Sequence, residues 1–420
     1  MGGVLAAPIY ALSSCLGTCL GAGCCKLAFA GYVDSAKGIK ILLLWLQVIA
    51  LVLSLCSSFL SQDSLEKPCS WLSRVFSGDV GICDCYSEAN RLDKECLYRQ
   101  STYRIEFSVL LVFLLMLLLS VSGCSKSAAM SWPVMKFMAL FVLSLIFMFI
   151  PNAFFSVVGQ VMSVIAAGFA VIQAIYWVDF TMNWNDAWVR ADSSWKPAGV
   201  SAWKWALLVF SAIFLGLGIG LCVHLCVAYD EGAWMAGPIV SIVVAVLLLL
   251  LSITEWCEVG TMVGSSAVVL YSQWLAWQAL ATGYPSCDSK TCGPPIWLSL
   301  VVFAGTMVIL AVRDSWGGES TAPVSLELAT RSARGGESSR DEESGDSIDS
   351  SSEAPLHHDA WDFSMQLLAH SFGATYITYV LAPSRGTATS VTIFVSLGVC
   401  LAIYGWILVA PKVLASRDFR

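Results

Sequence analysis

The chain has 420 residues, of which 57% are hydrophobic and 13% are charged, with a formal net charge of -7 at pH 7. Its mean hydropathy is +0.73. Soluble domains are typically about 45–50% apolar and about 25% charged. The composition excludes a soluble globular domain or a basic nucleic-acid-binding protein, and it indicates a membrane protein.

The first 37 residues form a Cys-rich segment that we expect to be associated with the membrane. Residues 4–33 are apolar and rich in glycine, so they either lie in or dip into the bilayer or make an additional eleventh span. The segment lacks the paired C-x-x-C spacing of structural zinc sites, so we expect no metal there. Cysteines beside a membrane are common acylation targets; small apolar packing is the alternative. The candidates are Cys15, Cys19, Cys24 and Cys25.

Ten apolar windows follow, each long enough to cross a hydrocarbon core of about 30 Å. They lie at approximately 38–60, 104–123, 131–150, 152–181, 203–228, 233–255, 259–282, 296–313, 360–382 and 388–412. In lipid each window must be helical, because no water satisfies an exposed backbone and the alternation of a barrel strand is missing. The predicted fold class is all-α and polytopic. The fourth window starts after Pro151 and is long enough to require a strongly tilted helix.

Charge and cysteine placement predict the orientation. A cytosolic N-terminus puts most lysines and arginines inside, including those of a tail at 413–420. It also puts an even number of cysteines on the outer or lumenal side, in a loop at 61–103 and in a second loop before the eighth helix. We expect disulfides there with open connectivity; the last two of these cysteines make a plausible local pair. The six are Cys69, Cys83, Cys85, Cys96, Cys287 and Cys292.

Residues 314–359, between the transmembrane regions 38–313 and 360–412, are rich in serine, glycine and acids. Such a segment cannot bury enough apolar surface to fold, so we expect a disordered cytosolic loop. It is either a solvated tether or a phosphorylated regulatory loop.

The sequence carries none of the common catalytic signatures. It lacks G-x-x-x-x-G-K-[ST], H-E-x-x-H and G-x-S-x-G, which predicts a non-enzymatic protein without a cofactor or metal. Of the four histidines, only His370 is expected deep in the membrane. It is either a packed hydrogen-bonding group or part of a proton or substrate path.

Four charges are expected at one depth near the cytosolic leaflet: Lys136, Asp179, Glu255 and Glu258. Charged groups in hydrocarbon usually pair or face a wet cavity. Two interpretations remain open. The lysine snorkels and the acids mark helix ends, or the charges form a polar crevice that lipid headgroups can enter.

The fourth window ends in an unusual stretch, VDFTMNWNDAWVR, at 178–190. Asn183, Trp184, Asn185 and Trp188 combine amides with indoles, and the two tryptophans are four residues apart on one helix face. This pattern is typical of the headgroup level of a bilayer.

The runs WPVMKF, FIPNAFF and IQAIYWVDFTMNWNDAWV between residues 132 and 189 resemble the signature region of the serine incorporator family, also called Serinc, TDE or TMS. The stretches GSSAVVLYSQWLAWQAL (264–280) and WILVAPKVLASRDFR (406–420) are similar as well. The matching residues of the signature are Lys136, Ile150, Pro151, Asp179, Phe180, Trp184, Asn185, Trp188 and Val189.

The resemblance implies ten spans in two bundles, crossed by a long tilted helix, with a lipid-accessible groove between them. It implies a carrier or scaffold that helps serine enter phosphatidylserine and sphingolipids, with membrane phospholipids, sphingolipids and serine-lipid synthases as partners. A passive lipid scramblase and a structural lipid-binding organiser are the alternatives, and homo-oligomerisation is open. The implied location is the endoplasmic reticulum, the Golgi or the plasma membrane.

Overall fold

The computed structural model describes residues 36–57, 81–85, 93–121, 133–194, 202–229, 232–254, 257, 260–284, 293–316, 354–383 and 386–413. These ranges contain ten α-helices, one in each predicted window, and no strand. They are α3 (Ala36–Ser57), α5 (Lys94–Val121), α7 (Pro133–Phe147), α8 (Asn152–Ser194), α9 (Ala202–Ala228), α10 (Ala236–Ile253), α11 (Met262–Gly283), α12 (Ile296–Trp316), α14 (Ala354–Leu381) and α15 (Thr387–Val413). The same ranges also contain two short 3₁₀ turns, η1 (Gly81–Cys85) and η2 (Gly232–Met235). The all-α prediction is confirmed.

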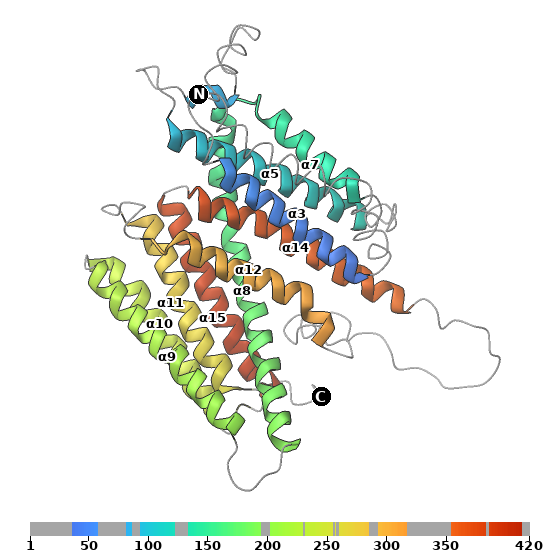
Figure 1. Ribbon diagram of the computed structural model, residues 1–420. Coiled ribbons are helices and arrows are strands. Elements are labelled where there is room, and N and C mark those ends of the chain that lie inside the picture. Colours follow the sequence, from blue (N-terminus) through green and yellow to red (C-terminus); the bar gives the residue numbers. More distant parts are fainter. Residues whose placement is uncertain are drawn as a thin grey trace, which may run out of the picture.

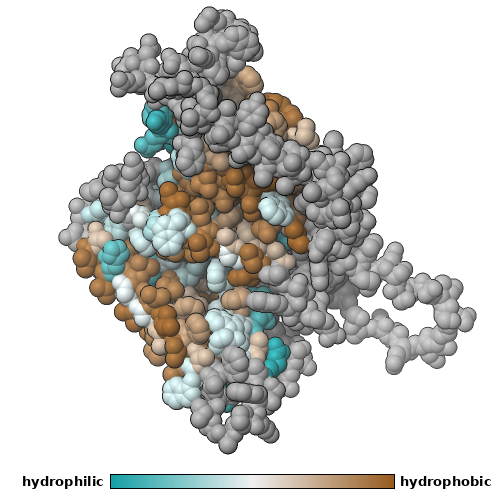
Figure 2. Space-filling view, viewed as in Figure 1, coloured by the Kyte–Doolittle hydropathy of each residue, from teal (hydrophilic) through white to brown (hydrophobic). Residues whose placement is uncertain are grey.

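Several helices can cross a membrane on length and composition alone. Within the part of the chain that the structure describes, five have this property, namely the apolar portions of α5, α8, α9, α10 and α15. The outward side chains of α9 and α10 are large and apolar; Val227 and Leu247 are 75% and 59% exposed. Figure 2 shows apolar side chains across much of the coloured surface. Such a surface is costly in water and suits contact with lipid tails.

The helices form two bundles (Figure 1). In the first bundle α5 packs against α3, α7 and α14, and α12 lies along α14. In the second bundle α11 packs against α9, α10 and α15. The long helix α8 runs through the molecule and contacts both bundles.

Close contacts show how α8 passes from one bundle to the other. In its first half, Gly159 and Gly168 lie against the rings of Tyr103 on α5 and Phe372 on α14. Two residues after Gly168, the Ala170 carbonyl accepts a hydrogen bond from the Tyr271 hydroxyl of α11 at 2.7 Å. In the second half of α8, the Trp184 ring lies 5.1 Å from that of Phe210 on α9. Each bundle therefore uses a different segment of the same helix.

Helix α8 has 43 residues and extends well beyond the predicted apolar window. At about 1.5 Å per residue it is about 64 Å long, roughly twice the hydrocarbon thickness. The polar stretch at 178–190 continues the helix, because its residues tolerate helical backbone even though they are not apolar. The hydropathy pattern located the start of this helix but not its end.

Other boundaries also differ from the windows. Helix α5 begins ten residues earlier than its window, at Lys94, and so includes charged residues at its start. Helices α12 and α14 extend a few residues into the segment 314–359. Most of that acidic segment and residues 1–35 lie outside the described residues, so the predictions made for them stay predictions.

The crossing of α5 and α8 depends on a glycine. A Cβ atom at Gly159 would lie 2.5 Å from two ring atoms of Tyr103, whose hydroxyl donates to the Ala382 carbonyl at 3.1 Å. We expect Gly159→Leu to lower the free energy of unfolding by about 1–3 kcal/mol through overpacking. Thermal unfolding in detergent measures this. Gly398→Leu is the matched control, since a Cβ there meets nothing within 4 Å; equal midpoints for the two variants would contradict the prediction.

Candidate functional site

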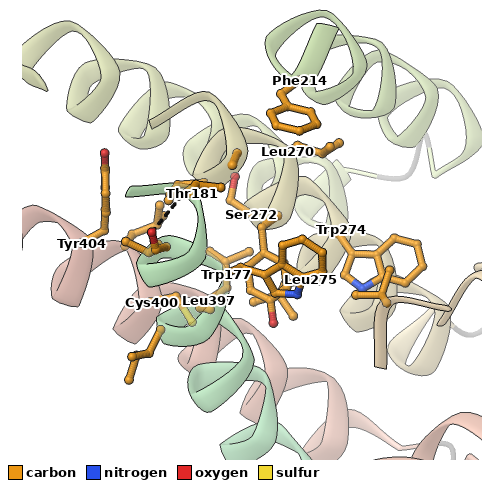
Figure 3. A pocket seen from close by; sticks show the side chains of 18 of the residues that line it. Trp177, Thr181, Phe214, Leu270, Ser272, Trp274, Leu275, Leu397, Cys400 and Tyr404 are labelled. Atoms are coloured by element: carbon orange, nitrogen blue, oxygen red, sulfur yellow. Dashed lines mark hydrogen bonds between the residues drawn. The ribbon is translucent and has the colours of Figure 1, made fainter. Parts of the chain in front are cut away.

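A cavity of about 630 Å³ lies where α8 meets the second bundle. Its walls come from α8, α9, α11 and α15, with Leu298 and Val302 of α12 on the side of the first bundle. Trp177, Thr181, Phe214, Leu275 and the other labelled side chains surround it in Figure 3. We call this cavity the α8 groove.

Most polar atoms around the α8 groove are bonded within the protein; the buried Trp274 indole N–H is an exception. The Trp177 indole N–H donates to Thr306 Oγ1 at 3.1 Å, and the Thr181 hydroxyl donates to the Val178 carbonyl at 2.9 Å. Further lining groups with protein partners are Tyr271, Ser272, Cys400 and Tyr404. The groove therefore presents mainly rings and aliphatic groups, which suit a hydrocarbon chain better than a charged headgroup.

Helix α9 contributes open space to the groove through two glycines. Gly216 and Gly220 both line the cavity, and a Cβ at either would meet nothing within 4 Å. Gly218, between them, faces α11 instead; its Cβ would lie 3.0 Å from Val269 Cγ1. The run Gly-x-Gly-x-Gly thus serves close helix packing on one side and cavity volume on the other.

The predicted Trp-rich end of α8 lies next to the groove. Trp184 lines the cavity and packs edge-on against Trp188, with ring centroids 5.0 Å apart. Both indoles contact Phe210 of α9, at 5.1 and 5.8 Å. Asn183 is exposed and Asn185 half-buried. The aromatic residues therefore form a packed cluster, and polar groups are exposed beside it.

The structure places the predicted charges in different parts of the molecule. Lys136 is buried on α7, which packs against α5 in the first bundle. Asp179 is half-buried on α8, between two residues that line the groove. Glu255 and Glu258 lie outside the described residues. The polar crevice stays a prediction.

Three of the six cysteines that were predicted to form disulfides are disulfide-bonded in the described part of the chain. Cys85 of η1 and Cys96 of α5 form a disulfide, and Cys83 is disulfide-bonded as well. The remaining candidates fall outside the described residues: Cys69, Cys287, Cys292 and the acylation candidates Cys15, Cys19, Cys24 and Cys25.

Sequence reasoning missed Arg104, which is fully buried. Its guanidinium donates to the carbonyls of Phe147 and Ile150, at 2.9 and 2.8 Å, and to Asn152 Oδ1 at 2.8 Å. It also lies 4.6 Å from the ring centroid of Phe155. Arg104 thereby satisfies carbonyls at the end of α7 and holds the start of α8. A charge at the first position of an apolar window was the available signal.

The ten helices of the described ranges form two bundles that share one helix, with an apolar groove along it; these features define a multi-pass integral membrane protein. The profile of the "Serine incorporator (Serinc)" family matches residues 13–417. The chain therefore belongs to the serine incorporator family.

Individual relatives agree with this assignment. "Serine incorporator 3" of Bos taurus is 24% identical over 392 residues, covering 78% of this chain and 82% of the relative. "Serine incorporator 3" of Mus musculus is 24% identical over 388 residues, with 76% and 80% covered. A "Probable serine incorporator" of Dictyostelium discoideum is 25% identical over 233 residues, with 52% and 55% covered.

Proposed function

We propose that this protein acts on membrane lipids without catalysing a reaction, by holding a lipid acyl chain in the α8 groove. The observation that carries the proposal is the groove itself. A volume of about 630 Å³ lies within the range of about 300–1,000 Å³ that is typical of small-molecule sites. Its polar lining atoms are mostly bonded to protein, and the unbonded Trp274 indole N–H is buried, so the favourable term for binding is the burial of apolar ligand surface.

The end of α8 supports a placement for the headgroup. Trp184 connects the groove to the aromatic cluster, and the exposed Asn183 and Asp186 lie on the same stretch of helix. Indoles and polar side chains of this kind favour the interface between hydrocarbon and water. A phospholipid or sphingolipid would then have its chain in the groove and its headgroup beside these residues.

The names of the relatives suggest the pathway in which such binding acts. We infer that the protein facilitates the incorporation of serine into phosphatidylserine and sphingolipids, presenting lipids to separate serine-lipid synthases as a carrier or scaffold. The groove-lining residues form no arrangement of nucleophile and base, which supports a non-enzymatic role.

A second candidate is a passive scramblase. Asp179 is half-buried beside the otherwise apolar groove. A charged group in that position favours hydration, and hydration would lower the barrier for a headgroup that moves along α8. In a purely structural lipid-binding organiser, the same lipid would stay bound.

The test uses the full-length protein in liposomes that contain phosphatidylserine with a diazirine on its acyl chain. We expect photocrosslinks in peptides of α8, α9 and α11 that line the groove. A fluorescent phosphatidylserine in the same vesicles, quenched by dithionite, measures transfer between leaflets. Crosslinking without transfer supports the carrier or scaffold, and crosslinking with transfer supports the scramblase. If the crosslinks scatter over the outer helix faces, the proposal is wrong.

A further inference from the structure

The first bundle contains buried polar groups that have no protein partner. Glu106 on α5 is fully buried; its Oε1 accepts a hydrogen bond from the Ser54 hydroxyl at 2.9 Å, while its Oε2 has none. Neither amide atom of Gln47 on α3 or of Gln366 on α14 is bonded, nor is His370 Nδ1. All four side chains are at most 3% exposed. An unpaired polar group in an apolar interior costs several kcal/mol, so such groups usually bind water.

Contacts between α5 and α14 fix their relative register. The Tyr103 hydroxyl donates to the Ala382 carbonyl, Phe113 packs against His370 at 5.4 Å, and Ser120 bonds to Ser364 at 3.2 Å. Residue numbers rise along α5 as they fall along α14, so the two helices are antiparallel. Each position on α14 can therefore be assigned a level along α5.

Residues of helix α3 can also be assigned levels along α5. Ser54 lies at the level of Glu106 through their hydrogen bond. One core cluster joins Leu43 and Leu46 of α3 with Phe113 and Met116 of α5. Helix α3 is therefore antiparallel to α5, and Gln47 lies near the level of Phe113.

The unpartnered groups then follow one another along the bundle. They begin with Ser101, whose hydroxyl is also buried and unbonded, and continue through Glu106 to the level of Gln47 and His370. Gln366 comes one turn later, just before the bonded hydroxyls of Ser120 and Ser364. From Ser101 to Ser120 the rise along α5 is about 28 Å at ~1.5 Å per residue, close to the thickness of about 30 Å of a hydrocarbon core.

The widest gap, between the levels of Glu106 and His370, is about 10 Å at ~1.5 Å per residue. Thr375 and Thr378 of α14 fall in this interval, and both are fully buried. Each hydroxyl donates to a carbonyl of its own helix, at 2.7 and 3.1 Å, and keeps lone pairs that can accept a hydrogen bond from water.

We propose that the first bundle contains a file of water molecules between α3, α5 and α14 that conducts protons across the membrane, with Glu106 and His370 as the exchanging groups. A proton enters at Glu106 Oε2 and leaves to the next water, and His370 accepts and returns one at Nδ1. No net bond is formed or broken. Buried carboxyl and imidazole groups in membrane proteins commonly serve such relays.

The charged neighbours leave Glu106 able to exchange a proton. Arg104 is two residues away, but its guanidinium is held by the carbonyls of Phe147 and Ile150. Tyr98 is the titratable neighbour on α5 itself, and α3 and α14 contribute Ser54 and His370. Lys136 is at the other end of α7 from Phe147, the residue of that helix that lies at Arg104. The α8 groove belongs to the other side of the molecule, so this inference does not rest on the proposed function.

The test measures proton entry into liposomes that contain the full-length protein and an internal pH-sensitive dye, with a potassium diffusion potential set by valinomycin. We expect the wild type to acidify several-fold faster than protein-free vesicles. Glu106→Gln keeps the shape but removes the exchangeable proton, and it should lose most of the flux. Ser211→Ala, which removes a buried hydroxyl on α9 that is bonded to Leu207, should retain the wild-type rate.

The variant Gln47→Met distinguishes a water-filled file from a bundle that contains no water. In a dry bundle, removal of an unbonded amide raises the unfolding midpoint and leaves any flux unchanged. In a hydrated file, the same change slows the flux, because a thioether cannot relay hydrogen bonds. Thermal unfolding in detergent, followed by size-exclusion chromatography, confirms that each variant is folded. Wild-type flux equal to that of protein-free vesicles, or equal flux in the wild type and Glu106→Gln, would overturn the proposal.

Discussion

Leucine in place of Gly220 should weaken acyl-chain binding by about tenfold or more, because its side chain would occupy the α8 groove. A Cβ at this position meets nothing within 4 Å, so the substitution does not strain the helices. Displacing part of a bound chain removes about 1.5–3 kcal/mol of apolar burial, equivalent to about 10–150-fold in affinity. The yield of groove crosslinks to diazirine phosphatidylserine, titrated against unlabelled lipid, measures the effect.

The control is the same substitution at Gly398 on α15. This glycine is exposed, does not line the groove, and also has open space at its Cβ. Gly398→Leu should bind lipid as the wild type does. Gly216→Leu fills a neighbouring part of the groove and should resemble Gly220→Leu. If both groove variants crosslink normally, the acyl chain lies elsewhere.

Methionine in place of Arg104 should reduce stability by about 3–5 kcal/mol, because buried carbonyls then lose their donor. The carbonyls of Phe147 and Ile150 at the end of α7 are affected, together with Asn152 at the start of α8. Thermal unfolding followed by size-exclusion chromatography should show a large fall in the midpoint.

Two further variants identify the cause. Arg104→Lys keeps the charge but lacks the planar fork that reaches several acceptors, so it should fall between methionine and the wild type. Arg99→Met removes an exposed arginine from the same helix and should have little effect. Equal midpoints for Arg104→Met and Arg99→Met would mean that the carbonyls find other donors.

The number and position of the helices were predictable, because in lipid a long apolar run has only the helix available. Hydropathy alone could not place the end of α8, since the residues around Asn183 and Trp184 are polar yet helical. It also placed the start of α5 at Arg104, although the helix begins at Lys94. In both cases the windows measured suitability for contact with lipid, whereas the helices continue through polar residues, many of them exposed.

The groove was less predictable than the helices. Its walls come from five helices, and no local pattern in any of them indicates a cavity. The alternating glycines of α9 were a signal only once their neighbours were known. Arg104 binds mainly backbone carbonyls, which every residue has, so most of its partners cannot be recognised from the sequence.

The order of the helices along the chain has a consequence for synthesis. The last two helices, α14 and α15, go to different bundles, where α14 packs against α5 and α15 against α11. Neither core can close until the ribosome has synthesised α14 and α15, which follow the other described helices in the chain. A chain that stops before Ala354 would leave two open bundles in the membrane, and cellular quality control would meet both defects at once.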